Sequence, residues 1–314
     1  MCARTPYWLT IDMEQVTAHA LEFVDDPAEF LAATADHLAA DPVVTTVIAT
    51  VTERIRAADS RGVERGPHPC WWAIVRDDRG VVCGVAMRTA PFRPHPIYVL
   101  PMPHDAAVEL ARTLHARDEL VTGVNGALPA ARAVAEETAR LTGAKVRVHE
   151  HMRLFELGEL EVPPAPPGRL RRAVEADAEL CLAWYRAFAM AAAEQAGRSE
   201  PHNNSAEMFT VDEILDRIHD QVIWLWEDGD GQIVHLTGAN LPANDVTRIG
   251  PVYTPAEHRG HRYASRAVDE VSELYVDQGV RCCLFTDQEN PTSNAIYQRL
   301  GYRPVVDMVN LLVE

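Results

Sequence analysis

The sequence has little positive charge. Its 29 lysines and arginines stand against 46 aspartates and glutamates, so the formal net charge is -17 over 314 residues. Such a surface repels phosphate backbones and anionic lipids, which argues against general binding to nucleic acid or to a membrane. A cationic partner, such as an amine, is compatible with this charge.

Long apolar runs and a visible secretion signal are also missing. No stretch approaches the length of a membrane span, and residues 1–10 contain no basic segment followed by an apolar one. The six cysteines form no Cys-x-x-Cys pair, which is typical of reduced thiols in a cytoplasmic protein. Cys282 and Cys283 are adjacent in an apolar run, so strand geometry directs them to opposite faces.

Several well-known catalytic motifs are absent. The sequence contains no Gly-x-Gly-x-x-Gly, Gly-x-Ser-x-Gly or Walker-type loop. Dinucleotide, serine-hydrolase and nucleoside-triphosphatase sites therefore lack their minimum parts. His202 stands near Asn203 and Asn204, but no further ligands follow at metal spacing. We therefore expect no metal site.

The composition that remains is that of a globular protein. Hydrophobic residues make up 47% of the chain and charged residues 24%, which provides ample core. At about 150 residues per domain, the length favours two domains. The segment Val162-Pro163-Pro164-Ala165-Pro166-Pro167 can form neither a helix nor an interior strand. We expect a first domain over 1–160, a linker over 161–168 and a second domain over 169–314.

Apolar periodicity predicts the same order of elements in both halves: two helices, three strands, a helix, a strand, a helix and a strand. This repetition indicates an α/β fold built by architectural duplication. In the second half the expected helices cover 177–196, 211–219, 263–278 and 291–300. The expected strands cover 223–227, 233–239, 248–254, 280–286 and 305–313.

The segment between the strand 248–254 and the helix that follows it has the features of an anion site. Backbone N–H groups at a helix N-terminus have no intrahelical partners and lie at the positive end of the helix dipole. This arrangement suits a pyrophosphate. Arg259, His261 and Arg262 add side-chain donors. A solvated basic turn explains the loop alone equally well.

A second informative segment is the helix expected over 291–300. Asn290 can be its N-cap, Pro291 takes its first position, and Gly301 closes its end. Asn294 and Tyr297 are three residues apart and share a face. Taken alone, Tyr297 is more often a packing residue than a catalytic one.

Together the two segments resemble the GNAT superfamily of acyl-CoA-dependent N-acyltransferases. Arg259 and Ala264 match the first and last positions of that family's loop pattern, Arg/Gln-x-x-Gly-x-Gly/Ala. Asn290 stands seven residues before Tyr297, as in the family. The resemblance covers the second half in residues and element order, and the first half in element order only.

The resemblance implies two GNAT-like domains, each a mixed, mostly antiparallel sheet flanked by helices. By the resemblance, the first is a degenerate copy, because its equivalent loop, 101–107, contains neither arginine nor glycine. In the second half, Arg262 replaces the central glycine of the pattern. We expect this arginine to point away, or to keep an ordinary helical backbone and add a cation, rather than to block the site.

The same resemblance implies where acetyl-CoA binds as co-substrate. The pantetheine arm runs along the strand at 252–254, whose N–H groups bond it, and the pyrophosphate lies on the loop and the start of the following helix. The implied binding residues are Val252, Tyr253, Thr254, Arg259, Gly260, His261, Arg262, Tyr263, Ala264, Ser265, Asn290 and Ser293.

The implied reaction needs an acid and a base. Tyr297 matches the tyrosine that protonates the departing thiolate, and a phenol with a pKa near 10 is protonated at neutral pH. Glu227, at the end of an expected strand, is the candidate base by position. Glu194, Glu200 and His235 are further candidates, and water can also accept the proton.

We therefore expect an N-acetyltransferase that moves the acetyl group of acetyl-CoA to a primary amine of a small molecule, by direct attack in a ternary complex. An inactive acyl-CoA binder or interaction protein of the same fold is one alternative. An acetyltransferase acting on protein or peptide amines is another. A homodimer is compatible with the sequence.

Overall fold

The computed structural model describes residues 19–199 and 209–314. Cys2, Glu200 and the segment 202–204, which were singled out in the sequence, lie outside the described residues. Among the described residues, no helix is long and apolar enough to cross a membrane.

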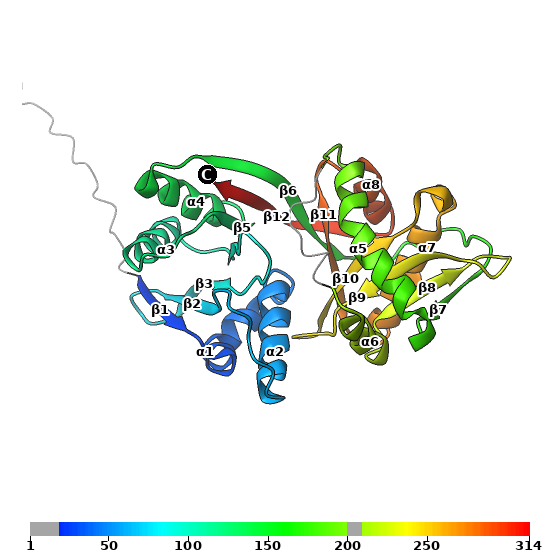
Figure 1. Cartoon of the computed structure of the whole chain (residues 1–314), viewed down its shortest axis with the longest axis horizontal. Helices are drawn as coiled ribbons and strands as arrows, with labels where there is room; N and C mark the ends of the chain where they lie inside the picture. Colours follow the sequence, from blue (N-terminus) through cyan, green and yellow to red (C-terminus); the bar gives the residue numbers. More distant parts are fainter. Residues whose placement is uncertain (1–18, 200–208) are drawn as a thin grey trace, which may run out of the picture.

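One sheet runs through both halves of the described chain (Figure 1). Its strand order is β1-β2-β3-β4-β5-β12-β6-β11-β10-β9-β8-β7. The first half supplies β1 (Ala20–Val24), β2 (Trp71–Arg76), β3 (Val82–Arg88), β4 (Ile97–Val99), β5 (Gly123–Ala127) and β6 (Val146–Leu157). The second half supplies β7 (Arg169–Arg172), β8 (Ile223–Glu227), β9 (Ile233–Ala239), β10 (Val246–Tyr253), β11 (Arg281–Asp287) and β12 (Tyr302–Val313).

The two halves exchange their last strands. β12 lies between β5 and β6 of the first half, and β6 in turn lies between β12 and β11. β6 and β12 pair antiparallel from Tyr302 opposite Leu157 to Val313 opposite Val146. Figure 1 shows these long strands side by side across the middle of the molecule. The sheet of each half is therefore completed by a strand of the other half.

Helices cover both faces of this sheet. In the first half, α1 (Pro27–Ala40) and α2 (Thr46–Ser60) pack on one face, and α3 (His104–Ala116) and α4 (Ala130–Thr142) on the other. In the second half, α5 (Ala178–Gln195) and α6 (Val211–His219) pack on one face, and α7 (Tyr263–Val276) and α8 (Pro291–Arg299) on the other.

The predicted duplication is confirmed, with a mostly antiparallel sheet in which β4–β5 and β10–β11 are the parallel pairs among the described strands. Cys282 and Cys283 face different cores, as predicted. Sequence periodicity missed β1 and β7, two short strands at the ends of the sheet, where one strand neighbour gives the chain little reason for regular alternation.

Candidate acyl-CoA site

The strands β10 and β11 separate part-way along their length. They pair in parallel at only three positions, from Val246 opposite Arg281 to Arg248 opposite Cys283. Beyond Arg248, β10 continues to Tyr253, and its register against β9 shifts between Ile249 and Val252. The backbone groups of the last part of β10 on the β11 side therefore have no strand partner. This is the gap that an extended ligand arm needs if it is to add to the sheet.

The loop after β10 ends in a left-handed residue. A short 3₁₀ turn, Ala256–His258, precedes Arg259, and α7 begins at Tyr263. Arg262 is the N-cap of α7 with φ 68° and ψ 12°, and it makes no side-chain cap bond. The expectation that Arg262 keeps an ordinary helical backbone was wrong. The backbone at this position still has the left-handed conformation that favours glycine, and this conformation is sterically strained for an arginine.

The N-terminus of α7 opens onto a cavity of about 260 Å³. Most of the expected binding residues line it, and they come from β10, the loop, α7 and α8: Val252, Thr254, Arg259, Gly260, His261, Arg262, Tyr263, Ala264, Ser265 and Ser293. No side chain caps the first turn of α7, so its N–H groups remain available to an anion. Arg259 is fixed by a bond from its Nε to the Thr254 carbonyl at 3.1 Å, which leaves its terminal nitrogens free to bind.

Two of the expected binding residues do not line the cavity. Tyr253 turns its ring to the other face of the sheet, where it packs against Trp184 of α5 with 5.8 Å between ring centres. Asn290 is buried, and its Oδ1 accepts a bond from the Ser293 N–H at 3.0 Å. Asn290 is thus the N-cap of α8, as its sequence context predicts.

Tyr297 projects from α8 into the same cavity. Its ring packs edge-on against Tyr302 at 6.0 Å, and 8% of the residue is exposed. Burial raises the pKa of Tyr297 well above its ordinary value, so the hydroxyl is protonated at neutral pH. Burial is the only cause of this shift among the described residues, with no hydrogen bond to the hydroxyl, which leaves it able to donate to a ligand in the cavity.

His235 lies beneath the cavity and is fully buried. Its Nδ1 and the Thr254 Oγ1 are 2.7 Å apart, and its Nε2 is 2.7 Å from the Thr237 Oγ1. Burial lowers the pKa of His235 to about 3, so the ring is neutral. A neutral ring donates at one nitrogen and accepts at the other, and it therefore fixes the Thr254 hydroxyl at the cavity wall.

The structure does not bring the candidate base Glu227 to the cavity. Its carboxylate, at the end of β8, accepts bonds from Arg169 at 2.9 Å and from Arg171. These bonds hold the pKa of Glu227 below its ordinary value. β9 separates β8 from β10 in the sheet, and no local pattern predicts that two arginines on β7 bind this carboxylate. Glu194 lies exposed near the end of α5, close to Tyr253.

Sequence reasoning missed several residues that line the cavity: Gln195, His258, Thr292, Ile296 and Arg299. Thr292, Ile296 and Arg299 lie on the same face of α8 as Ser293 and Tyr297. Their helical spacing in the sequence could have predicted this. Arg299 adds a cation near the loop, whose own arginines are Arg259 and Arg262. In a chain with an excess of acids, this concentration of positive charge favours an anionic ligand.

The corresponding place in the first half is the end of β4. β4 pairs with β5 along its whole length, from Ile97 opposite Val124 to Val99 opposite Gly126. A Cβ at Gly126 would lie only 1.9 Å from the Val99 carbonyl oxygen, so the two strands are in close contact. β4 ends at this contact, whereas β10 continues past its last pair with β11 to Tyr253.

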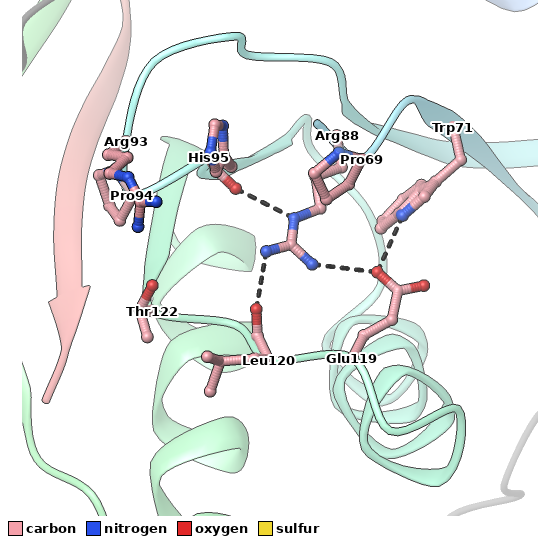
Figure 2. Close-up of a pocket in the computed structure, with 9 residues that line it drawn as sticks. All are labelled: Pro69, Trp71, Arg88, Arg93, Pro94, His95, Glu119, Leu120 and Thr122. Atoms are coloured by element: carbon pink, nitrogen blue, oxygen red, sulfur yellow. Dashed lines mark hydrogen bonds and ion pairs between the residues drawn. The ribbon is translucent and has the colours of Figure 1, made fainter. Parts of the chain in front are cut away.

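A larger cavity, of about 690 Å³, lies at the other ends of β4 and β5. Figure 2 shows Arg88 at its centre, donating to the carbonyls of His95 and Leu120 and to Glu119, which also accepts from Trp71. These polar groups satisfy one another, so they hold the cavity wall together rather than offer free bonds.

Comparison with known proteins agrees with this geometry. Residues 184–302 match the model of the acetyltransferase (GNAT) family. This match lies within the second half of the chain. The matched range contains the cavity, the loop after β10 and Tyr297. Members of this family typically use acetyl-CoA as co-substrate, and the match supports an acyl-CoA-dependent N-acetyltransferase. No curated protein matches the chain.

Solved structures extend the likeness to the whole fold. The chain is similar to a GCN5-related N-acetyltransferase from Sphaerobacter thermophilus, with 20% identity, a TM-score of 0.54, and coverage of 87% of this chain and 92% of that one. It is also similar to a GNAT-family acetyltransferase from Colwellia psychrerythraea, with 9% identity, a TM-score of 0.53, and coverage of 94% and 100%. The chain is also similar to a tandem GNAT protein from the clavulanic acid biosynthesis pathway, with 16% identity, a TM-score of 0.51, and coverage of 94% of this chain and 98% of that one. The tandem GNAT fold is thus shared over nearly the full chain.

Proposed function

We propose that the second half, residues 169–314, transfers the acetyl group of acetyl-CoA to a primary amine of a small molecule, and that residues 1–160 form a degenerate GNAT-like domain. The main support is the cavity that joins three features: the unpaired end of β10, the uncapped start of α7 and the free hydroxyl of Tyr297. These features suit the thiol arm, the pyrophosphate and the leaving thiolate of one ligand.

In this proposal the amine attacks the thioester directly while both substrates are bound. The N–H of Val252, the first residue after the register shift in β10, polarises the thioester carbonyl. The departing thiolate accepts a hydrogen bond and then the proton from Tyr297. The amine loses its proton to water or to a carboxylate, and Glu227 is not that group because two arginines already bind it.

The proposal is tested with Tyr297→Phe in the full chain. We expect kcat in a thiol-release assay to fall by about a hundredfold, because a positioned acid contributes at least that much. The dissociation constant for acetyl-CoA, measured by calorimetry, should stay unchanged, since the phenyl ring keeps the packing. Tyr302→Phe is the matched control, because its hydroxyl bonds to Ser272 outside the cavity.

Two results would count against the proposal. If Tyr297→Phe keeps wild-type turnover, its role as acid is excluded. If acetyl-CoA at millimolar concentration neither raises the melting temperature nor releases heat on mixing, the acyl-CoA site itself is excluded. Binding without turnover on any amine would favour an inactive acyl-CoA-binding protein.

A further inference from the structure

Three arginines gather on the face of the sheet opposite to the acyl-CoA cavity. Arg54 comes from α2 of the first half, Arg217 from α6 and Arg248 from β10. α2 contacts β10, and although Arg54 is exposed as a residue, loss of solvation lowers the pKa of its guanidinium, as do the charges of Arg217 and Arg248, against the opposing effect of Glu213. The three like charges are therefore close enough to repel one another.

Arg217 and Arg248 are half-buried, and Arg54 is exposed. No carboxylate of the described residues forms an ion pair with any of the three. Arg217 lies over the rings of Tyr185 and Phe209, 5.7 Å from each centre. The carboxylate of Glu213 accepts a bond from the Thr210 N–H as part of a helix cap. The cluster thus keeps a net positive charge, which Glu213 offsets only in part.

Arg248 also leaves a hydrogen-bond donor unused. With the Asn240 amide turned so that its oxygen faces the guanidinium, that oxygen accepts from Nε at 3.2 Å and from Nη2 at 2.8 Å. The Nη1 of Arg248 remains buried without a partner, as does the neighbouring hydroxyl of Tyr98. Two buried polar groups without partners cost free energy unless a ligand satisfies them.

The arginine cluster lies beside the point where β10 and β11 separate, which is the proposed position of the thioester. Arg248 is the last residue of β10 that pairs with β11, so the strands part directly after it. Val246, two residues earlier in β10, packs in the core under α1 and α2, so alternation along the strand turns Arg248 to that same face, away from α7. An acceptor that approaches the thioester from this face would pass the three arginines.

We propose that the acceptor amine carries an anionic group, a carboxylate or a phosphate, and that Arg54, Arg217 and Arg248 bind it beside the parting of β10 and β11. This inference rests on the proposed acetyltransferase function. It names the class of acceptor, an amino acid or an amino phosphate, and it gives the first half a part in the site through Arg54.

The test compares acceptors that differ only in charge. β-Alanine, γ-aminobutyrate and ε-aminocaproate are each assayed beside the corresponding uncharged amide, with O-phosphoethanolamine as the phosphate arm. Charge-assisted bonds favour the anion, so kcat/KM should be at least about tenfold higher for one or more of the anionic acceptors than for the uncharged partner. The acceptor with the highest kcat/KM shows whether the bound group is a carboxylate or a phosphate.

Arg54→Met decides whether the cluster is responsible, because Arg54 is exposed and its loss should not disturb the core. We expect this variant to lose the preference for the anionic acceptor and to keep wild-type kcat/KM on the amide. Arg56→Met, on the same helix, is the matched control, since Arg56 pairs with Glu53 instead. It should keep the preference.

Equal turnover of anionic and uncharged acceptors would overturn the inference and leave the acetyltransferase function intact, and so would a preference that survives Arg54→Met. If no amine turns over, the proposed function fails, and the anion site is then judged by calorimetry with the same amino acids and O-phosphoethanolamine alone. Binding that Arg54→Met weakens about tenfold supports the site, and absence of binding overturns it.

Discussion

Arg262 stands at a motif position that is glycine in the family pattern, and its backbone is left-handed in the structure. The motif position requires a left-handed backbone, which a glycine adopts without strain and an arginine does not. The surrounding structure imposes the same path on arginine, because Gly260 and the start of α7 fix the loop on both sides. Backbone geometry at this position is therefore decided by the fold and not by the residue.

Arg262→Gly should raise the free energy of unfolding by about 1 kcal/mol, since it removes the left-handed strain. Guanidinium denaturation of the full chain measures this change. Arg262→Ala keeps the strain while it removes the charge, so it separates the two effects and should bring no gain. A glycine variant less stable than wild type would show that the guanidinium makes contacts worth more than the strain.

His235 is buried and neutral, and this makes stability depend on pH. The unfolded chain takes up a proton on this histidine below about pH 6.5, whereas the folded chain does so only near pH 3. Between these values the unfolded state binds more protons, so the free energy of unfolding falls as the pH falls.

Substitution His235→Gln isolates that contribution, because glutamine can still bond to Thr254 or Thr237 but does not titrate. From about pH 7.5 to about pH 5, the wild type should lose about 2 kcal/mol more than the variant in urea unfolding. If the free energy of unfolding fell equally with pH in the two proteins, His235 would be protonated in the folded state and Thr254 would be held in another way.

At the scale of elements, the connection from β11 to α8 places Tyr297. The Asn294 side chain donates to the carbonyls of Asp287 at 2.8 Å and Asn290 at 2.7 Å, and its Oδ1 accepts from the Thr286 hydroxyl at 2.6 Å. One amide thus ties the end of the strand to the first turn of the helix. The sequence predicted the helix and its cap but not this tie.

Asn294→Ala should lower the free energy of unfolding by about 2 kcal/mol, because it removes the side-chain bonds to Asp287, Asn290 and Thr286 that join β11 to α8. It should also reduce turnover by displacing α8. Gln298→Ala, at an exposed position of the same helix, is the control and should change stability by less than about 0.5 kcal/mol. Equal stability of the two variants would contradict the proposed role of the tie.

At the scale of the whole molecule, the exchanged strands make the two halves depend on each other. β6 supplies Leu154 and Phe155, which are fully buried in different cores, and Phe155 packs with the second half. An ion pair between Arg153 and Asp307, 2.6 Å apart, joins β6 to β12. A second, between Arg281 and Glu156 at 2.7 Å, joins β11 to β6. The proline-rich segment 161–168 separates the sequence into halves but not the sheet.

Residues 169–314 expressed alone should therefore not form a stable monomer. The fragment exposes the edge of β11 and leaves β12 without either neighbour, which favours aggregation or pairing between copies. Circular dichroism and size-exclusion chromatography measure the outcome, and co-expression with residues 1–168 should restore a folded complex. A folded monomeric fragment that binds acetyl-CoA would show that β6 is dispensable.

The sequence by itself determined the order of helices and strands, the duplication, and the loop and helix that surround the cavity, because these depend on local periodicity, capping and turn residues. Only the tertiary structure decided that Glu227 is occupied by Arg169 and Arg171, that β6 and β12 change places, and that Arg54, Arg217 and Arg248 meet. Such contacts join segments far apart in the chain, and no local pattern records which distant side chains the fold will bring together.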